Sequence, residues 1–209
     1  MSTICPTVTA YSEHDYHQQL NSVASFAERV HIDLMDGLFA PTKALGISDI
    51  VWPANLLVDL HLMYQNPMDY LDQIITLKPS LVVVHNEADV HHMHFAAELH
   101  KHGIKAGLAL LQATPVHFSQ QIMHSFDHVL IFSGNLGLQG GQADMALLTK
   151  VSEVKRLWPD VEIGWDGGIN DSNALQLING GVDVLNVGGY IAQAADSREA
   201  YRQLIRIAA

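Results

Sequence analysis

The sequence contains a single cysteine among its 209 residues, and charged residues make up only 16% of it. A lone Cys5 excludes a disulfide within the chain, which agrees with a reducing compartment. No apolar run reaches the roughly 18 residues that span a membrane, and the first residues lack the basic region and long apolar stretch of a signal peptide. We therefore expect a cytoplasmic protein with no membrane partner.

Basic side chains are also scarce, with 11 Lys and Arg against 22 Asp and Glu and a formal net charge of −11. The field of such a chain repels polyanions, which excludes nucleic acid as a partner. A small phosphorylated ligand still fits, because backbone N–H groups can hold a phosphate on an acidic protein. The expected partners are thus a small molecule and further copies of the chain, as a homo-oligomer.

Apolar residues make up 48% of the sequence, enough for one substantial core. No linker or low-complexity tract divides the chain, so we expect a single domain over residues 1–209. Eight short apolar runs recur roughly every 20 to 30 residues, the length of one strand and helix unit. They are ICPTV from Ile4, VHIDLM from Val30, LLVDLHLM from Leu56, LVVVH from Leu81, AGLALL from Ala106, HVLIF from His128, VEIGWD from Val161 and VDVLNV from Val182.

Helical periodicity separates these runs. Ser12 and Asp15 form a capping-box-like start, and Asn66 with Pro67 offers a cap and a first-turn proline for a later helix. Continuous apolar strands are typical of a parallel sheet that is covered on both faces. Eight strand and helix units favour closure into a (β/α)8 TIM barrel, with all strands parallel, over an open doubly wound sheet.

Polar residues lie at the carboxyl ends of several predicted strands, where barrel enzymes place their reacting groups. Strand alternation puts His31, Asp33 and Met35 on one face, while His61 and Asp166 occupy the ends of two other runs. Two imidazoles and two carboxylates suit zinc, iron, manganese or cobalt better than calcium. We therefore predict one divalent metal ion, bound by His31, Asp33, His61 and Asp166.

The same segments carry a resemblance to a known family. They are CPT from Cys5, HIDLMDGLFAP from His31, HLM from His61, NP from Asn66, VHNEA from Val84, ATP from Ala113, GGQ from Gly140, DGG from Asp166 and the pair Gly188-Gly189. In this order they resemble the ribulose-phosphate 3-epimerases across nearly the full chain. The resemblance implies a metal-dependent isomerase in which Asp33 and Asp166 are also the catalytic acid and base.

Chemistry supports that assignment, because epimerisation beside a ketone removes a proton from one face of a carbon and returns it on the other. The expected substrates are D-ribulose 5-phosphate and D-xylulose 5-phosphate. Met35 and Met63 are the expected apolar floor of the pocket. The predicted substrate-binding residues are Thr7, His61, Leu138, Gln139, Gly140, Gly141, Asp166, Gly167, Gly168, Gly188 and Gly189.

The chain also departs from the family pattern. Thr7 and Gly189 stand where serine is usual, and the loop from Ser133 to Gln142 is longer than usual. These changes keep open a six-carbon substrate such as allulose 6-phosphate, and a barrel that binds phosphosugars without turnover. A decarboxylase or synthase is disfavoured because neither Lys43 nor Lys105 is placed as a catalytic lysine. His85 and Glu87 are candidates for a supporting role behind the metal ligands.

Overall fold

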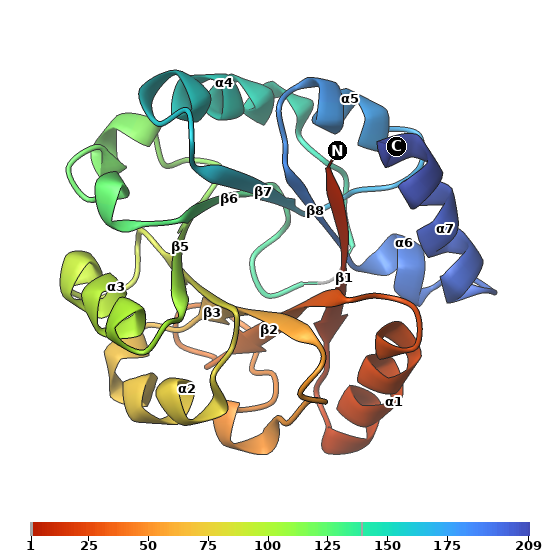
Figure 1. Cartoon of the computed structure of the whole chain (residues 1–209), viewed down its shortest axis with the longest axis horizontal. Coiled ribbons are helices and arrows are strands. Elements are labelled where there is room, and N and C mark those ends of the chain that lie inside the picture. The colour runs from red at the N-terminus through yellow and green to blue at the C-terminus, as the bar shows by residue number, and fades with distance from the viewer. Residues whose placement is uncertain (1, 139) are drawn as a thin grey trace.

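The computed structural model describes residues 2–138 and 140–209, and its eight strands form a closed parallel barrel (Figure 1). Each strand pairs with its sequence neighbours, and β8 closes the barrel against β1. The predicted (β/α)8 fold is thus confirmed. The strands are β1 Thr3–Thr9, β2 Arg29–Met35, β3 Leu57–Met63, β4 Leu81–His85, β5 Lys105–Leu110, β6 His128–Phe132, β7 Glu162–Asp166 and β8 Val184–Val187.

Helices surround the barrel on its outside (Figure 1). They are α1 Glu13–Ala24, α2 Leu71–Leu77, α3 His92–Lys101, α4 Leu148–Leu157, α5 Ala174–Asn179, α6 Gly189–Ala192 and α7 Ser197–Ala208. Short 3-10 turns replace or precede helices at Ile47–Asp49, Pro67–Tyr70, Val116–Ser119, Met123–Ser125 and Met145–Leu147. Within the described residues, no helix combines the length and apolar character needed to cross a membrane.

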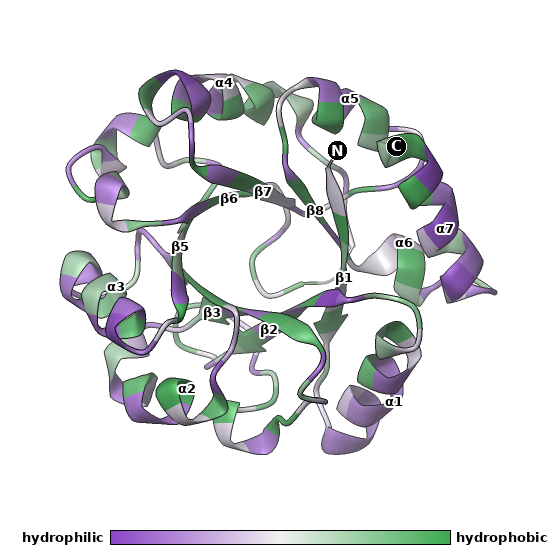
Figure 2. Ribbon diagram, in the orientation of Figure 1, coloured by the Kyte–Doolittle hydropathy of each residue, from purple (hydrophilic) through white to green (hydrophobic). Residues whose placement is uncertain are grey.

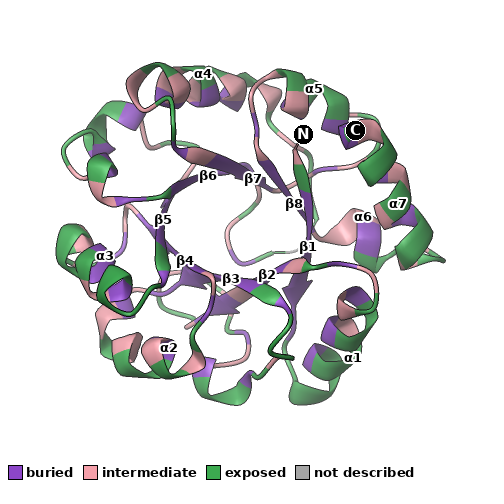
Figure 3. Cartoon of the chain, viewed as in Figure 1, coloured by how far each residue is buried: buried purple, intermediate pink, exposed green. Residues whose placement is uncertain are grey.

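The strands are apolar and buried while the outer helices alternate between apolar and polar residues (Figures 2 and 3). β4 and β6 are buried at every position, which is why they appear in the sequence as uninterrupted apolar runs. The helices bury only the side that faces the sheet, as Tyr16, Leu20 and Val23 do in α1. The resulting core holds the strand ends in fixed positions around the barrel mouth.

The two predicted helix starts differ in their outcome. Ser12 caps α1 as expected, because its side chain accepts a hydrogen bond from the backbone N–H of Asp15. Asn66 occupies the predicted N-cap position, but its side chain makes no capping hydrogen bond. Pro67 instead begins a 3-10 turn that leads into α2, because proline fixes a backbone angle that suits a first turn.

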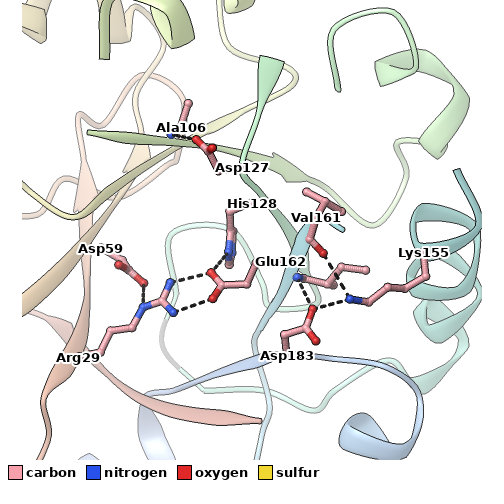
Figure 4. Close-up of polar contacts among 10 residues, drawn as sticks. Arg29, Asp59, Ala106, Asp127, His128, Lys155, Val161, Glu162 and Asp183 are labelled. Carbon is pink, nitrogen blue, oxygen red and sulfur yellow. Dashed lines mark hydrogen bonds and ion pairs between the residues drawn. The ribbon is translucent and has the colours of Figure 1, made fainter. Parts of the chain in front are cut away.

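A charged network closes the end of the barrel opposite the mouth (Figure 4). Arg29 donates from Nε to Asp59 Oδ2 at 2.7 Å and from its two terminal nitrogens to both oxygens of Glu162, at 2.9 and 3.0 Å. His128 Nδ1 donates to Glu162 Oε2 at 2.7 Å. Asp59 and His128 are each 2% exposed, so this end of the barrel interior is filled by paired polar and charged side chains.

Acid is expected to weaken the barrel through Glu162. Burial alone raises the pKa of Glu162, but hydrogen bonds from His128 and Arg29 lower it below the 4.5 of an ordinary glutamate. As the pH falls, the Glu162 carboxylate is protonated in the unfolded chain before it is protonated in the folded one. Its contribution to stability is therefore present above the ordinary glutamate pKa and is lost as the pH falls below about 5. Urea unfolding from pH 7 to 3 should show a shallower loss of stability in Glu162→Gln than in the wild type. Equal slopes would contradict this role.

Candidate functional site

Four side chains from three strands converge at the mouth of the barrel. They are His31 and Asp33 on β2, His61 on β3 and Asp166 on β7, and one ligand atom from each lies within 4.8 Å of all the others. His61 Nδ1 is 2.9 Å from Asp33 Oδ1 and 3.7 Å from Asp166 Oδ2, and His31 Nε2 is 3.4 Å from Asp33 Oδ1. The structure thus brings together all four predicted metal ligands.

The geometry of these four residues fits a divalent cation. His31 Nε2 is buried and has no hydrogen-bond partner among the described residues, so a donor atom is left free at the centre of the cluster. Ligands bound at about 2.1 Å in tetrahedral geometry lie about 3.4 Å apart. The three ligand-atom pairs given above, at 2.9, 3.4 and 3.7 Å, lie close to this spacing. Two imidazoles and two carboxylates form the mixed nitrogen and oxygen set preferred by zinc, manganese, iron or cobalt.

The surroundings of the two carboxyl groups move their pKa values in opposite directions. Burial, followed by the nearby charge of Asp33, raises the pKa of Asp166. Burial also acts to raise the pKa of Asp33, but the neighbouring imidazoles of His31 and His61 outweigh it and lower that pKa. Burial lowers the pKa of His61 to about 4, so this imidazole is neutral at physiological pH and able to bind a cation.

Side chains outside the cluster contact the predicted metal ligands on the side away from the cluster centre. Thr9 donates from Oγ1 to Asp33 Oδ2 at 2.7 Å, and this fixes the carboxylate. His61 faces the cluster with Nδ1, while its Nε2 lies 2.9 Å from His85 Nε2. His85 Nδ1 in turn lies 3.6 Å from Glu87 Oε2. These contacts orient Asp33 and His61, as hydrogen-bonded neighbours of the ligands do in metal sites.

The cluster opens into a cavity of about 750 Å³. Asp33 and Asp166 line it, whereas His31 and His61 are almost fully buried and lie outside its lining. Gln139 is outside the described residues. The other predicted pocket residues that line the cavity are Thr7, Met35, Met63, Leu138, Gly140, Gly141, Gly167, Gly168, Gly188 and Gly189.

Two glycines after β7 allow neighbouring loops to meet backbone to backbone. Gly167 and Gly168 both have positive φ angles, of 109° and 72°. A Cβ on Gly167 would overlap the backbone of Gly134, and one on Gly168 would overlap the backbone of Ala143. Only glycine fits here, and both glycines line the cavity directly after Asp166.

Sequence reasoning missed several polar residues on the cavity wall, and Thr9 and Asn186 are two of them that lie on barrel strands. Thr9 follows Thr7 by two positions on β1, so strand alternation puts both on the inner face. Asn186 is the one polar residue of β8 and lies two residues before Gly188, and a polar residue within an apolar strand is a recognisable sign of a functional position.

The fold and the cluster define a TIM barrel with a site of metal-binding type at the carboxyl ends of its strands. A comparison with protein families finds a match to the ribulose-phosphate 3 epimerase family over residues 3–192, and the chain belongs to that family. The family comprises isomerases that act on carbohydrates.

Individual relatives agree with this assignment. The ribulose-phosphate 3-epimerase of Bacillus subtilis is 33% identical over 187 residues, covering 85% of this chain and 86% of the relative. The Aquifex aeolicus protein of the same name is 30% identical and covers 98% of this chain and 96% of the relative. The crystal structure of a 3-hexulose-6-phosphate synthase has a TM-score of 0.76 over 99% of this chain and all of that one. At 19% identity, that likeness shows the fold alone.

Proposed function

We propose that this protein is a metal-dependent ketose-phosphate 3-epimerase that interconverts D-ribulose 5-phosphate and D-xylulose 5-phosphate. The observation that carries the proposal is the pair Asp33 and Asp166, which line one cavity from β2 and β7 and share a cluster with two imidazoles. These strands are three steps apart around the eight-stranded barrel, so the acids approach a bound sugar from different sides.

In this proposal Asp33 and Asp166 alternate as base and acid. One carboxylate removes the C3 proton from one face of the ketose, and the other, in its protonated form, delivers a proton to the opposite face. His31 and His61, with both acids, would hold the cation. When bound, the cation supplies electrostatic stabilisation of the negative charge that develops on the substrate oxygens. Met35 and Met63 keep the reacting carbon away from water.

The phosphate would bind at the glycine-containing loops after β6, β7 and β8. These loops line the same cavity with Gly140, Gly141, Gly168, Gly188 and Gly189. Glycine backbone can approach a phosphate closely, and barrel enzymes often bind phosphate at the last strand loops. This placement leaves the carbon chain of the sugar between the glycines and the two acids.

Exchange of the C3 hydrogen with deuterated water tests the proposal. Wild-type protein with added Zn²⁺, Mn²⁺ or Co²⁺ should incorporate deuterium into D-ribulose 5-phosphate and convert it to D-xylulose 5-phosphate. Treatment with a chelator should remove the activity, and adding back the metal should restore it. Exchange with allulose 6-phosphate alone would move the assignment to a six-carbon substrate, and binding without exchange would contradict an epimerase.

Loss of His85 is expected to weaken metal binding. If His61 binds the cation through Nδ1, its Nε2 carries the hydrogen that His85 Nε2 accepts across 2.9 Å. Replacing His85 by Phe removes this acceptor, and we expect metal affinity to fall about 10- to 100-fold, as for other supporting residues of metal sites. Competition with a fluorescent chelator measures the affinity. His94→Phe, at an exposed position in α3, is the matched control and should retain wild-type affinity.

A further inference from the structure

Asn186 is a buried polar side chain on the cavity wall whose amide oxygen has no hydrogen-bond partner among the described residues. The residue lies in β8 and is 2% exposed. The other β8 residues, Val184, Leu185 and Val187, are apolar, so the strand itself does not require a polar group here. An unpaired buried amide oxygen disfavours folding, which indicates that Asn186 is retained for a ligand.

Thr7 has the same property on the neighbouring strand. It is 5% exposed, it lines the same cavity, and its Oγ1 also lacks a partner among the described residues. The two side chains therefore do not hydrogen-bond to each other, although β1 and β8 are paired with Cys5 opposite Asn186. The amide oxygen can only accept, while the threonine hydroxyl can also donate. A ligand hydroxyl can satisfy both at once, by donating to Asn186 and accepting from Thr7.

The position of this pair identifies which hydroxyl it would meet. Asn186 is the register partner of Asp166 on β7. Thr7 lies beside Gly188, because a Cβ built on that glycine would be 3.7 Å from the Thr7 Cβ. The pair is therefore between a proposed proton-transfer residue and the glycines proposed for phosphate. If C3 of a ketose phosphate lies at Asp166 and the phosphate lies at the glycines, the substrate group that faces Asn186 and Thr7 is the hydroxyl on C4.

We propose that Asn186, together with Thr7, binds the C4 hydroxyl of the substrate and makes the enzyme selective for the configuration at that carbon. This inference rests on the proposed function, since it uses the placement of C3 and of the phosphate. Asn186 is then a specificity-determining residue. A site that is built to hydrogen-bond a hydroxyl discriminates against a substrate that presents it in another direction, because the buried polar groups are then left unpaired.

The test compares two substrates that differ only at C4, D-xylulose 5-phosphate and L-ribulose 5-phosphate. C3 hydrogen exchange is measured with the metal-loaded wild type, Asn186→Val, Thr7→Val and the double variant. We expect the wild type to prefer D-xylulose 5-phosphate. In Asn186→Val, kcat/KM for this substrate should fall about 10- to 100-fold, and the preference between the epimers should shrink by a similar factor. The double variant should lose less than the product of the single effects, because both residues bind one hydroxyl.

Thermal unfolding separates a binding role from a structural one. Asn186→Val replaces an unpaired polar group with a residue that suits a buried strand, so its Tm should equal or exceed that of the wild type. An active wild type whose C4 preference is unchanged in Asn186→Val would overturn the inference alone. A wild type without any C3 exchange would overturn both the inference and the proposed function.

Discussion

Replacing Asp166 by Asn is expected to reduce kcat at least 10³-fold while the barrel remains folded. An amide cannot exchange the proton that inversion at C3 requires, and a positioned acid or base contributes about 10² to 10⁴ to a rate. Asp33→Asn should have the same effect, because each acid serves one face of the carbon. Steady-state assays in both directions measure the loss, with the metal content of each variant determined in parallel.

Stability provides the control for these two variants. The charge of Asp33 contributes to the raised pKa of Asp166, so the two carboxylates repel each other in the absence of a cation. A neutral Asn at residue 166 removes this repulsion, and the metal-free variant should unfold at the same temperature as the wild type or at a higher one. Wild-type turnover in either variant would refute the assigned roles. A variant that fails to fold would assign these carboxyl groups to structure.

Replacing Arg29 by Met is expected to destabilise the barrel by about 3 kcal/mol, the largest stability effect that we predict for a single side chain. Arg29 joins Asp59 and Glu162, which approach it from β3 and β7. Without the guanidinium, the 2% exposed Asp59 would keep a buried charge or take up a proton. Chemical denaturation at pH 7 measures the difference in unfolding free energy.

Arg206→Met is the matched control for Arg29→Met. Arg206 donates to Glu199 at 2.7 Å on the outer helix α7, but both side chains are more than half exposed, at 63% and 53%. Water screens such a pair, so its loss should cost less than about 1 kcal/mol. Equal effects of the two substitutions would show that the network at the closed end of the barrel contributes no more than a surface ion pair.

Much of the fold was predictable because its signals are local. Each of the eight strands appears in the sequence as an apolar run, since both faces of a parallel barrel strand are covered. The four clustered side chains were also accessible to prediction, because strand alternation and the equivalence of strand ends bring His31, Asp33, His61 and Asp166 to one place. The resemblance to a family then pointed to the same four residues.

The remaining features depend on distances between segments that sequence spacing does not encode. Arg29 and Glu162 are 133 residues apart, and their fork-like pairing follows only from closure of the barrel. The Cβ overlap that requires Gly167 arises from the approach of Gly134 in another loop. The polar residue Asn186 is visible in the sequence of β8, but the missing partner of its amide oxygen is seen only in the folded chain. A single domain, self-assembly and a cytoplasmic location stay predictions from the sequence.

The coordination of the bound metal tests the central claim most directly. Wild-type protein loaded with Zn²⁺ or Co²⁺ should bind one ion per chain, and X-ray absorption should show two imidazole nitrogens with carboxylate oxygens at about 2.0 to 2.2 Å. The imidazole signal should fall by half in His31→Ala and, separately, by half in His61→Ala, since each histidine supplies one nitrogen. A shell without imidazole, or a stoichiometric ion that survives both substitutions unchanged, would contradict the site on which the proposed epimerase depends.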